Sequence, residues 1–319
     1  MNGVVGRLAP SPTGAQHVGN ARTYLIAWLS ARSRGGRVVL RIEDIDSPRV
    51  KAGAPEQACE DLRWLGLDWD DGPIIQTRRL PLYQSALEQL KLRNLVYPCT
   101  CTRADVERAA SAPHLDHEGP VYPGTCAARS ADDVASLGGV PYCWRFRLPE
   151  RTPAFDDAFR GPTALDLHSL GGDFVVWKAP RNGVTATPAY QLAVVVDDAA
   201  QGVTEVVRGD DLVSSTPRQL LLYEALGLTP PRFVHVPLVV GLDGRRLAKR
   251  HGDTRLSSLR EAGVSAERLL GLLAWSCGWS ERIEPITAVE LIARFDLARI
   301  PQAPLTLTPE LLRAIGFPA

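Results

Sequence analysis

The feature that most constrains the fold is a short apolar run, 4–8, which ends in a loop rich in Pro, Ser and Gly. A helical pattern follows the loop, and the apolar face of this predicted helix includes Leu25, Ile26, Trp28 and Leu29. A second apolar run, 37–42, follows the helix and should therefore lie parallel to the first strand. Because the first N–H groups of a helix are free, this strand–loop–helix unit predicts an anion site.

Two charged side chains stand where these predicted strands end. Arg7 lies at the end of the first strand, and Glu43 directly follows the second. The carboxyl ends of neighbouring parallel strands are where open α/β sheets bind ligands. One site would then offer a guanidinium, a carboxylate and a phosphate cradle, which suits an amino acid beside a nucleotide.

Composition excludes some classes of protein. The chain has 319 residues, enough for one large domain and a small one, and 36 basic residues balance 36 acidic ones. A net charge of +0 gives no global attraction for nucleic acid, although a local basic patch stays open. We find neither a signal peptide nor an apolar run approaching the roughly 18 residues of a membrane span. We therefore expect a cytoplasmic protein without membrane contact, and a monomer.

Apolar patterning further along predicts an α/β domain over 1–250 and a small α-helical region over 251–319. The run 193–196 is continuously apolar, which is typical of a strand buried on both faces. The segment 68–73 is predicted as a turn-rich loop. Further strands are predicted at 142–148, 174–177, 192–196, 204–207 and 233–240. Helices are predicted at 82–93, 216–226, 268–275, 288–295 and 309–315.

The segment 95–136 interrupts this pattern as an insertion rich in Cys, His, Pro and Gly. Cys99, Cys101 and Cys126 suit a structural zinc ion, which binds thiolates tetrahedrally and can supply folding energy where a core is missing. His114 or His117 could be the fourth ligand, and three free thiols in a loop are the simpler alternative. We expect the other cysteines to be small buried apolar residues, because the six thiols do not form a disulfide pattern: Cys59, Cys143 and Cys277.

The loop and its flanks carry a family resemblance. Arg7, the Pro-Ser-Pro-Thr-Gly run 10–14, His17 and Gly19 together resemble the HIGH signature of class I glutamyl-type tRNA synthetases. The run Arg-Ile-Glu-Asp-Ile-Asp at 41–46 matches the next motif of that family. Asn20 departs from the signature, because it stands where the second histidine would be. An amide can still donate a hydrogen bond to phosphate or ribose, but it carries no charge.

The resemblance implies a Rossmann-like catalytic domain that uses ATP with Mg²⁺, L-glutamate and a tRNA. It implies that glutamate is held by Arg7, Ala9, Ser11, Glu43, Tyr190 and Arg208. It implies catalytic roles for His17, Gly19, Asn20 and Lys249. The run 246–250 resembles the KMSKS loop of the family, and the resemblance implies that ATP is bound by His17, Gly19, Asn20, Arg246, Leu247, Ala248, Lys249 and Arg250. It also implies one structural zinc ion, held by Cys99, Cys101, Tyr122 and Cys126.

Simpler interpretations of these residues stay open. Arg7 and Glu43 could merely pair with each other, and Tyr190 could belong to the core. Asp210 or Asp211 could be a structural partner of Arg208. The basic run that resembles the KMSKS loop could be solvated surface.

The resemblance covers Arg7 to about Arg250, and only 251–319 follow, so we expect no anticodon-binding domain. In this respect the chain resembles a truncated branch of the family. Members of that branch activate glutamate without tRNA and attach it to the queuosine base at the wobble position of tRNA(Asp). The alternatives are a glutamyl-tRNA synthetase acting on tRNA(Glu), an inactive paralogue that binds an amino acid or nucleotide, and a small-molecule nucleotidyltransferase.

Overall fold

The computed structural model describes residues 3–45, 50–109, 120–180, 183, 185–247 and 254–318. The strands are β1 Val5–Leu8, β2 Arg37–Ile42, β3 Asp71–Ile75, β4 Val96–Cys99, β5 Cys143–Phe146, β6 Phe155–Asp157, β7 Gly161–Thr163, β8 Phe174–Lys178, β9 Thr187–Pro188, β10 Glu205–Gly209, β11 Arg232–Val236, β12 Val239–Val240 and β13 Leu305–Thr306. The α-helices are α1 Val18–Arg32, α2 Ala54–Trp64, α3 Leu80–Leu92, α4 Arg103–Ala109, α5 Tyr190–Ala200, α6 Ser215–Leu226, α7 Leu256–Glu261, α8 Ala266–Ser276, α9 Ala288–Ile292 and α10 Pro309–Ala314. None of the helices in these ranges has the length and hydrophobicity that a membrane span requires.

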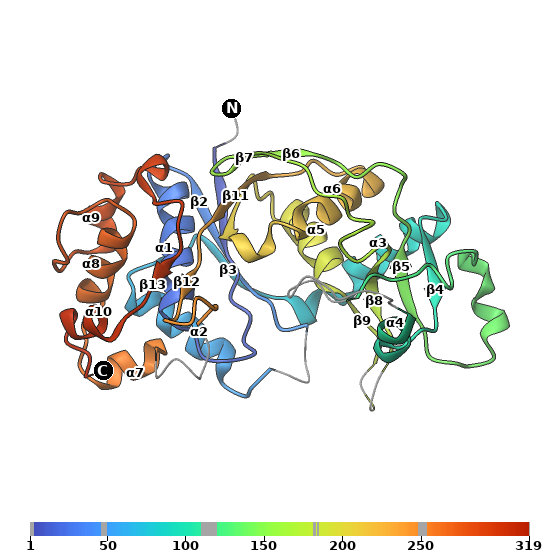
Figure 1. Cartoon of the computed structure of the whole chain (residues 1–319), viewed down its shortest axis with the longest axis horizontal. Helices are drawn as coiled ribbons and strands as arrows, with labels where there is room; N and C mark the ends of the chain where they lie inside the picture. Colours follow the sequence, from blue (N-terminus) through green and yellow to red (C-terminus); the bar gives the residue numbers. More distant parts are fainter. Residues whose placement is uncertain are drawn as a thin grey trace.

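Parallel strands form the centre of the molecule (Figure 1). β1 pairs in parallel with β2, which pairs in parallel with β3, and β10 pairs in parallel with β11. The backbone N–H of Thr204, next to β10, donates to the carbonyl of Val5 in β1 at 2.9 Å. The α/β fold with a parallel sheet is confirmed, and the carboxyl ends of β1 and β10 lie at the same edge.

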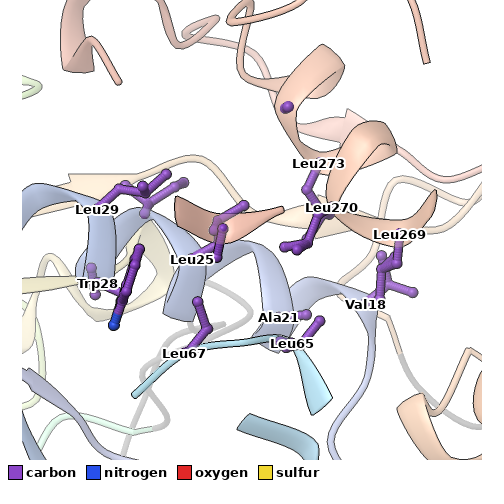
Figure 2. Packing of buried hydrophobic residues seen from close by; sticks show 14 of the residues in the cluster. Val18, Ala21, Leu25, Trp28, Leu29, Leu65, Leu67, Leu269, Leu270 and Leu273 are labelled. Carbon is purple, nitrogen blue, oxygen red and sulfur yellow. The ribbon is translucent and has the colours of Figure 1, made fainter. Parts of the chain in front are cut away.

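Helix α1 is buried on most of its surface because it lies between the sheet and the C-terminal helices (Figure 2). Leu25 of α1 is completely buried in a cluster that also contains Leu67 after α2 and Leu273 of α8. The guanidinium of Arg22, also buried, donates to the carbonyl of Pro237 at 2.7 Å and to Ser276 Oγ at 3.1 Å. Residues on both sides of position 250 therefore share one core, and the predicted domain boundary there stays a prediction.

An antiparallel sheet in the order β4-β5-β8-β9 lies at the opposite end of the molecule from α8 and α9 (Figure 1). Its strand β4 starts the segment 95–136, which therefore joins a sheet and is not a free loop. This segment contributes to a small buried cluster of its own, which includes Tyr97, Cys99, Tyr122 and Cys126. Cysteine side chains therefore make up a large part of this small core.

The prediction of a strand at 192–196 is wrong, because these residues form part of helix α5. A short, continuously apolar run does not distinguish a buried strand from a buried helix, and Leu192, Ala193 and Val195 are buried on the helix. Two smaller predictions also need correction. The predicted loop 68–73 contains the start of β3, and the strand predicted at 233–240 is divided into β11 and β12 around Pro237, which has no N–H to donate.

We predict that Leu25→Ala lowers the free energy of unfolding by about 2–5 kcal/mol, because it leaves a cavity at a fully buried position. Urea denaturation followed by circular dichroism measures the change. Leu92→Ala is the matched control, since Leu92 is 88% exposed and the same substitution there should change the free energy by less than about 0.5 kcal/mol. Equal effects of the two substitutions would contradict the packing described for α1.

Candidate active site

A cleft of about 430 Å³ opens at the carboxyl ends of β1 and β10, beside the first turn of α1. Ten residues predicted from the sequence line it: Arg7, Ala9, Ser11, His17, Gly19, Asn20, Glu43, Tyr190, Arg208 and Arg246. Segments almost 240 residues apart in the chain thus meet in one cavity. The sequence did not single out other lining residues, among them Tyr24, Ala27, Leu238 and Val239, which belong to apolar patterns without a distinctive motif.

Arg7 is held at the base of the cleft by atoms of β10 and α5. Its Nη1 donates to the carbonyl of Val207 at 2.8 Å, and its Nε lies 4.0 Å from a carboxylate oxygen of Asp198. Burial lowers the pKa of Arg7, while the charge of Asp198 opposes the shift, and an arginine stays protonated in either case. Nε is buried and has no hydrogen-bond partner within the described part of the chain, and the carboxylate of Asp198 is its charged neighbour.

Arg41, and not Arg7, forms the ion pair with Glu43. The guanidinium of Arg41 is completely buried and lies 3.1 Å from Glu43 Oε1 and 2.7 Å from Asp198 Oδ1. Burial raises the pKa of Glu43, and the charges of Arg41 and Arg7 oppose this shift. The alternative in which Arg7 and Glu43 simply neutralise each other is therefore wrong, and Glu43 presents a fixed carboxylate beside the cleft.

Arg208 is 4% exposed and is held by neutral acceptors. Its Nε donates to His235 Nε2 at 2.9 Å and its Nη2 to Thr216 Oγ1 at 2.8 Å. Nη1 lies 3.4 Å from the hydroxyl of Tyr190, which lines the cleft and is 37% exposed, so this tyrosine is not a core residue. Neither aspartate that follows Arg208 pairs with it: Asp210 pairs with Arg160, and Asp211 with Arg246.

His17 is the N-cap of α1 and forms a capping box with Asn20. The His17 ring accepts the N–H of Gly19 at Nδ1, 3.1 Å away, and the Asn20 Oδ1 accepts the backbone N–H of His17 at 3.1 Å. Asn20 therefore stabilises the start of the helix, which is a role that an amide fills without charge. Gly19 favours this contact, because a Cβ there would lie 3.0 Å from the His17 ring and the ring would have to shift.

His17 is neutral at physiological pH. Burial, assisted by the nearby charge of Arg246, lowers the pKa of His17 to about 4. Because Nδ1 accepts a hydrogen bond, the single ring proton is on Nε2, which makes the ring a donor. A neutral donor at a helix N-terminus suits phosphate oxygens.

The start of the KMSKS-like run borders the cleft, and the chain after the run contacts the first turn of α1. Arg246 lines the cleft, whereas the side chain of Leu247 is buried in the main core and does not. On the other side, the carbonyl of Thr254 accepts the N–H of Val18 at 3.1 Å, at the start of α1. Ala248, Lys249 and Arg250 lie outside the described residues, so their predicted roles stay predictions.

The thiols of Cys99, Cys101 and Cys126 lie within 4.8 Å of one another. The Cys101 and Cys126 sulfur atoms are 3.7 Å apart, and the Tyr122 hydroxyl lies 3.4 Å from the Cys99 sulfur. Tetrahedral zinc with bonds of about 2.3 Å to sulfur and about 2.0 Å to oxygen would require spacings of about 3.8 and 3.5 Å. These four residues therefore fit a zinc ion, whereas His114 and His117 lie outside the described residues.

The comparisons with known proteins agree with this geometry. The family model described as "tRNA synthetases class I (E and Q), catalytic domain" matches residues 3–313, so the chain belongs to this family. It is 53% identical to a protein of Rhodopirellula baltica named glutamyl-Q tRNA(Asp) synthetase, over 95% of this chain and 96% of that protein. It is also 40% identical to the glutamate–tRNA ligase of Geobacter sulfurreducens, over 98% of this chain but 65% of that ligase.

A crystal structure of the glutamate-tRNA synthetase of Elizabethkingia anophelis matches with a TM-score of 0.80 and 29% identity, over 97% of this chain and 69% of that one. The predicted fold and the prediction of a ligase are thereby confirmed.

We predict that the purified chain holds about one zinc ion and that Cys101→Ser weakens zinc binding by about tenfold or more. Metal analysis and a chelator competition measure this. Cys59→Ser is the matched control, because Cys59 is buried in α2, outside the thiol cluster. Tyr122→Phe tests the fourth ligand, and an unchanged zinc affinity in that variant would exclude the phenol oxygen.

We predict that His17 stays neutral, with its proton on Nε2, from pH 8 down to about 5, because the pKa of His17 is about 4. Arg246→Gln removes a positive charge and should raise this pKa by less than about one unit, since burial is the larger cause. Nitrogen NMR of the imidazole measures both. Arg245→Gln is the control; a midpoint near 6.5 in the wild type, or a lower pKa in Arg246→Gln, would refute the assignment.

Proposed function

We propose that this chain activates L-glutamate with ATP, independently of tRNA, and transfers the glutamate to the queuosine base at the wobble position of tRNA(Asp). The observation that carries the proposal is the cleft in which two buried arginines, Arg7 and Arg208, lie beside the N-terminus of α1. The names of relatives that are 44–53% identical over nearly their full length support queuosine in tRNA(Asp) as the acceptor.

Glutamate fits the charged half of the cleft. Arg208 has no carboxylate partner among the described residues and suits the side-chain carboxylate of glutamate. Glu43 suits the ammonium group, and the guanidinium of Arg7, which lines the cleft, suits the α-carboxylate. Ala9, Ser11 and Tyr190 line the same half and would shape it around the aliphatic part of the substrate.

ATP fits the half of the cleft beside α1. The backbone N–H groups of Val18 and Gly19 are already bonded to Thr254 and His17. The donors that suit the phosphates are therefore the Nε2–H of His17 and the Nδ2 of Asn20, beside the positive end of the α1 dipole. We assign Arg246 and Lys249 to the same phosphates, and Leu247, Ala248 and Arg250 to the loop that carries them. Mg²⁺ bound with ATP would neutralise the leaving pyrophosphate.

In the first step an oxygen of the glutamate α-carboxylate bonds to the α-phosphorus of ATP, and the bond to pyrophosphate breaks. The products are glutamyl-adenylate and pyrophosphate. His17 and Lys249 would stabilise the negative charge that develops on the phosphate oxygens. In the second step a hydroxyl of the queuosine ring attacks the acyl carbon, the bond from that carbon to the AMP phosphate oxygen breaks, and the hydroxyl proton passes to the leaving phosphate or to solvent. Among the described lining residues the carboxylates are Glu43 and Asp211, and both are held in ion pairs with arginines, so alignment of the two reactants would supply much of this second step.

A glutamyl-tRNA synthetase that acts on tRNA(Glu) is the second candidate. The 40% identity to a glutamate–tRNA ligase favours it, although this chain matches 65% of that ligase. An inactive paralogue is disfavoured, because Asn20 caps α1 without disturbing the cleft. The proposed substrates are found in the cytoplasm, which supports the predicted location.

We predict glutamate-dependent exchange between ATP and labelled pyrophosphate without any tRNA. Lys249→Ala should lower the rate by about 10²–10³-fold, because a transition-state charge contact is lost. Lys91→Ala, in a pair with Glu88 on α3, is the matched control and should retain the rate.

Transfer of labelled glutamate then distinguishes the acceptors: tRNA(Asp) with queuosine, the same tRNA without it, and tRNA(Glu). Labelling of the first alone supports the proposal. Exchange that requires tRNA(Glu), followed by labelling of tRNA(Glu), supports the second candidate. Absence of exchange under every condition would establish an inactive paralogue.

A further inference from the structure

We infer that a buried pair, Asp157 and His235, positions Arg208 through an uncharged imidazole and thereby makes the cleft select an anionic side chain over its amide. The inference rests on the proposed function, in which Arg208 binds the glutamate side chain. Neither Asp157 nor His235 lines the cleft, so both act through Arg208 as positioning residues.

The pairing of strands places His235 beside Arg208. The parallel register of β10 and β11 makes the two residues direct neighbours, so their side chains leave the sheet on the same face. Nε of Arg208 donates to Nε2 of His235 at 2.9 Å. His235 is completely buried, and Asp157, at the end of β6, is 2% exposed.

The hydrogen bonds of Asp157 determine which ring nitrogen of His235 carries the proton. One carboxylate oxygen lies 2.6 Å from Nδ1 of His235, and the carboxylate also accepts the backbone N–H groups of Phe159, Arg160 and His235. Burial opposes ionisation of Asp157, but these hydrogen bonds outweigh it and lower the pKa of this carboxyl. An ionised carboxylate only accepts, so the ring proton lies on Nδ1.

The opposite side of the ring must then accept. A guanidinium has no acceptor atom, so Nε2 of His235 carries a lone pair toward Arg208, and the imidazole is neutral. Burial also lowers the pKa of His235, although Asp157 opposes this shift. Thr216, which is completely buried, supplies the second neutral acceptor at 2.8 Å from Nη2 of Arg208.

This arrangement fixes Arg208 without neutralising it. Arg41 lies against the carboxylates of Glu43, Asp197 and Asp198, whereas the acceptors that hold Arg208 are an imidazole, hydroxyl groups and a carbonyl. The carboxylate of Asp157 is separated from the guanidinium by the width of the imidazole. The positive charge of Arg208 is therefore left for the ligand, and a neutral amide such as glutamine would leave it uncompensated.

The test is the selectivity of His235→Leu for glutamate over glutamine in the pyrophosphate exchange. This variant removes the acceptor at similar volume, so Arg208 loses its fixed orientation. We expect KM for glutamate to rise about 10–100-fold, KM for ATP to stay within about twofold, and the glutamate/glutamine ratio of kcat/KM to fall at least about tenfold.

Two further variants complete the test. His235→Gln places a neutral amide oxygen near the position of Nε2 and should restore most of the selectivity. His168→Leu is the matched control, because His168 is exposed and is not among the cleft-lining residues, and it should match the wild type. Should His235→Leu fail to fold, Thr216→Val removes another buried neutral acceptor of Arg208 and should lower the same ratio.

The outcomes separate the two levels of the proposal. A wild-type chain without glutamate-dependent exchange refutes the proposed function and the inference with it. An active wild type together with a folded His235→Leu of unchanged selectivity refutes the inference alone. Equal increases of KM for ATP and glutamate would also refute it, because they indicate general damage to the active site.

Nitrogen NMR should find His235 neutral with its proton on Nδ1 at pH 7, and an imidazolium there would refute the mechanism.

Discussion

The balance of buried charges beneath the cleft is the constraint on which the rest of the site depends. Three guanidinium groups, of Arg7, Arg41 and Arg79, lie against three carboxylates, of Glu43, Asp197 and Asp198. Removing charges from water costs several kcal/mol per ion unless each finds partners. The cluster meets this condition because Gln76 and Tyr83 also donate to Asp197, at 2.8 Å each. Arg7 and Glu43 are thereby held at the cleft.

The charge cluster can form only because residues 190–200 are helical. Asp197 and Asp198 are successive residues on α5. Both are buried, against Arg41 of β2, Arg79 just before α3 and Tyr83 of α3. A strand would direct adjacent side chains to opposite faces, so the two carboxylates could not both reach this cluster. The apolar run that precedes them fits either state. What distinguishes the helix is the position of the partners of the two aspartates, Arg41, Arg79 and Tyr83, which lie far away in sequence.

The sequence predicted what is encoded locally. The strand, loop and helix start that carry Arg7, His17 and Gly19 are contiguous, and their order along the chain places them at one end of a parallel sheet. The thiol cluster was predictable because Cys99 and Cys101 are close in sequence and zinc chemistry restricts their partners. His235 and Asp157 were missed, because neither belongs to a motif and their proximity depends on the pairing of β10 with β11 and the position of β6.

The two kinds of buried arginine have different physical roles. Arg41 is neutralised by carboxylates on three sides, so it contributes structure and a fixed position for Glu43, but little field at the cleft. Arg208 is equally buried but is held by uncharged groups, so its charge acts on the ligand. A protein that must hold a cation firmly and still use its charge needs such neutral acceptors, because a directly bonded carboxylate would satisfy the guanidinium before the substrate arrived. In this chain a histidine with a carboxylate behind it meets both requirements.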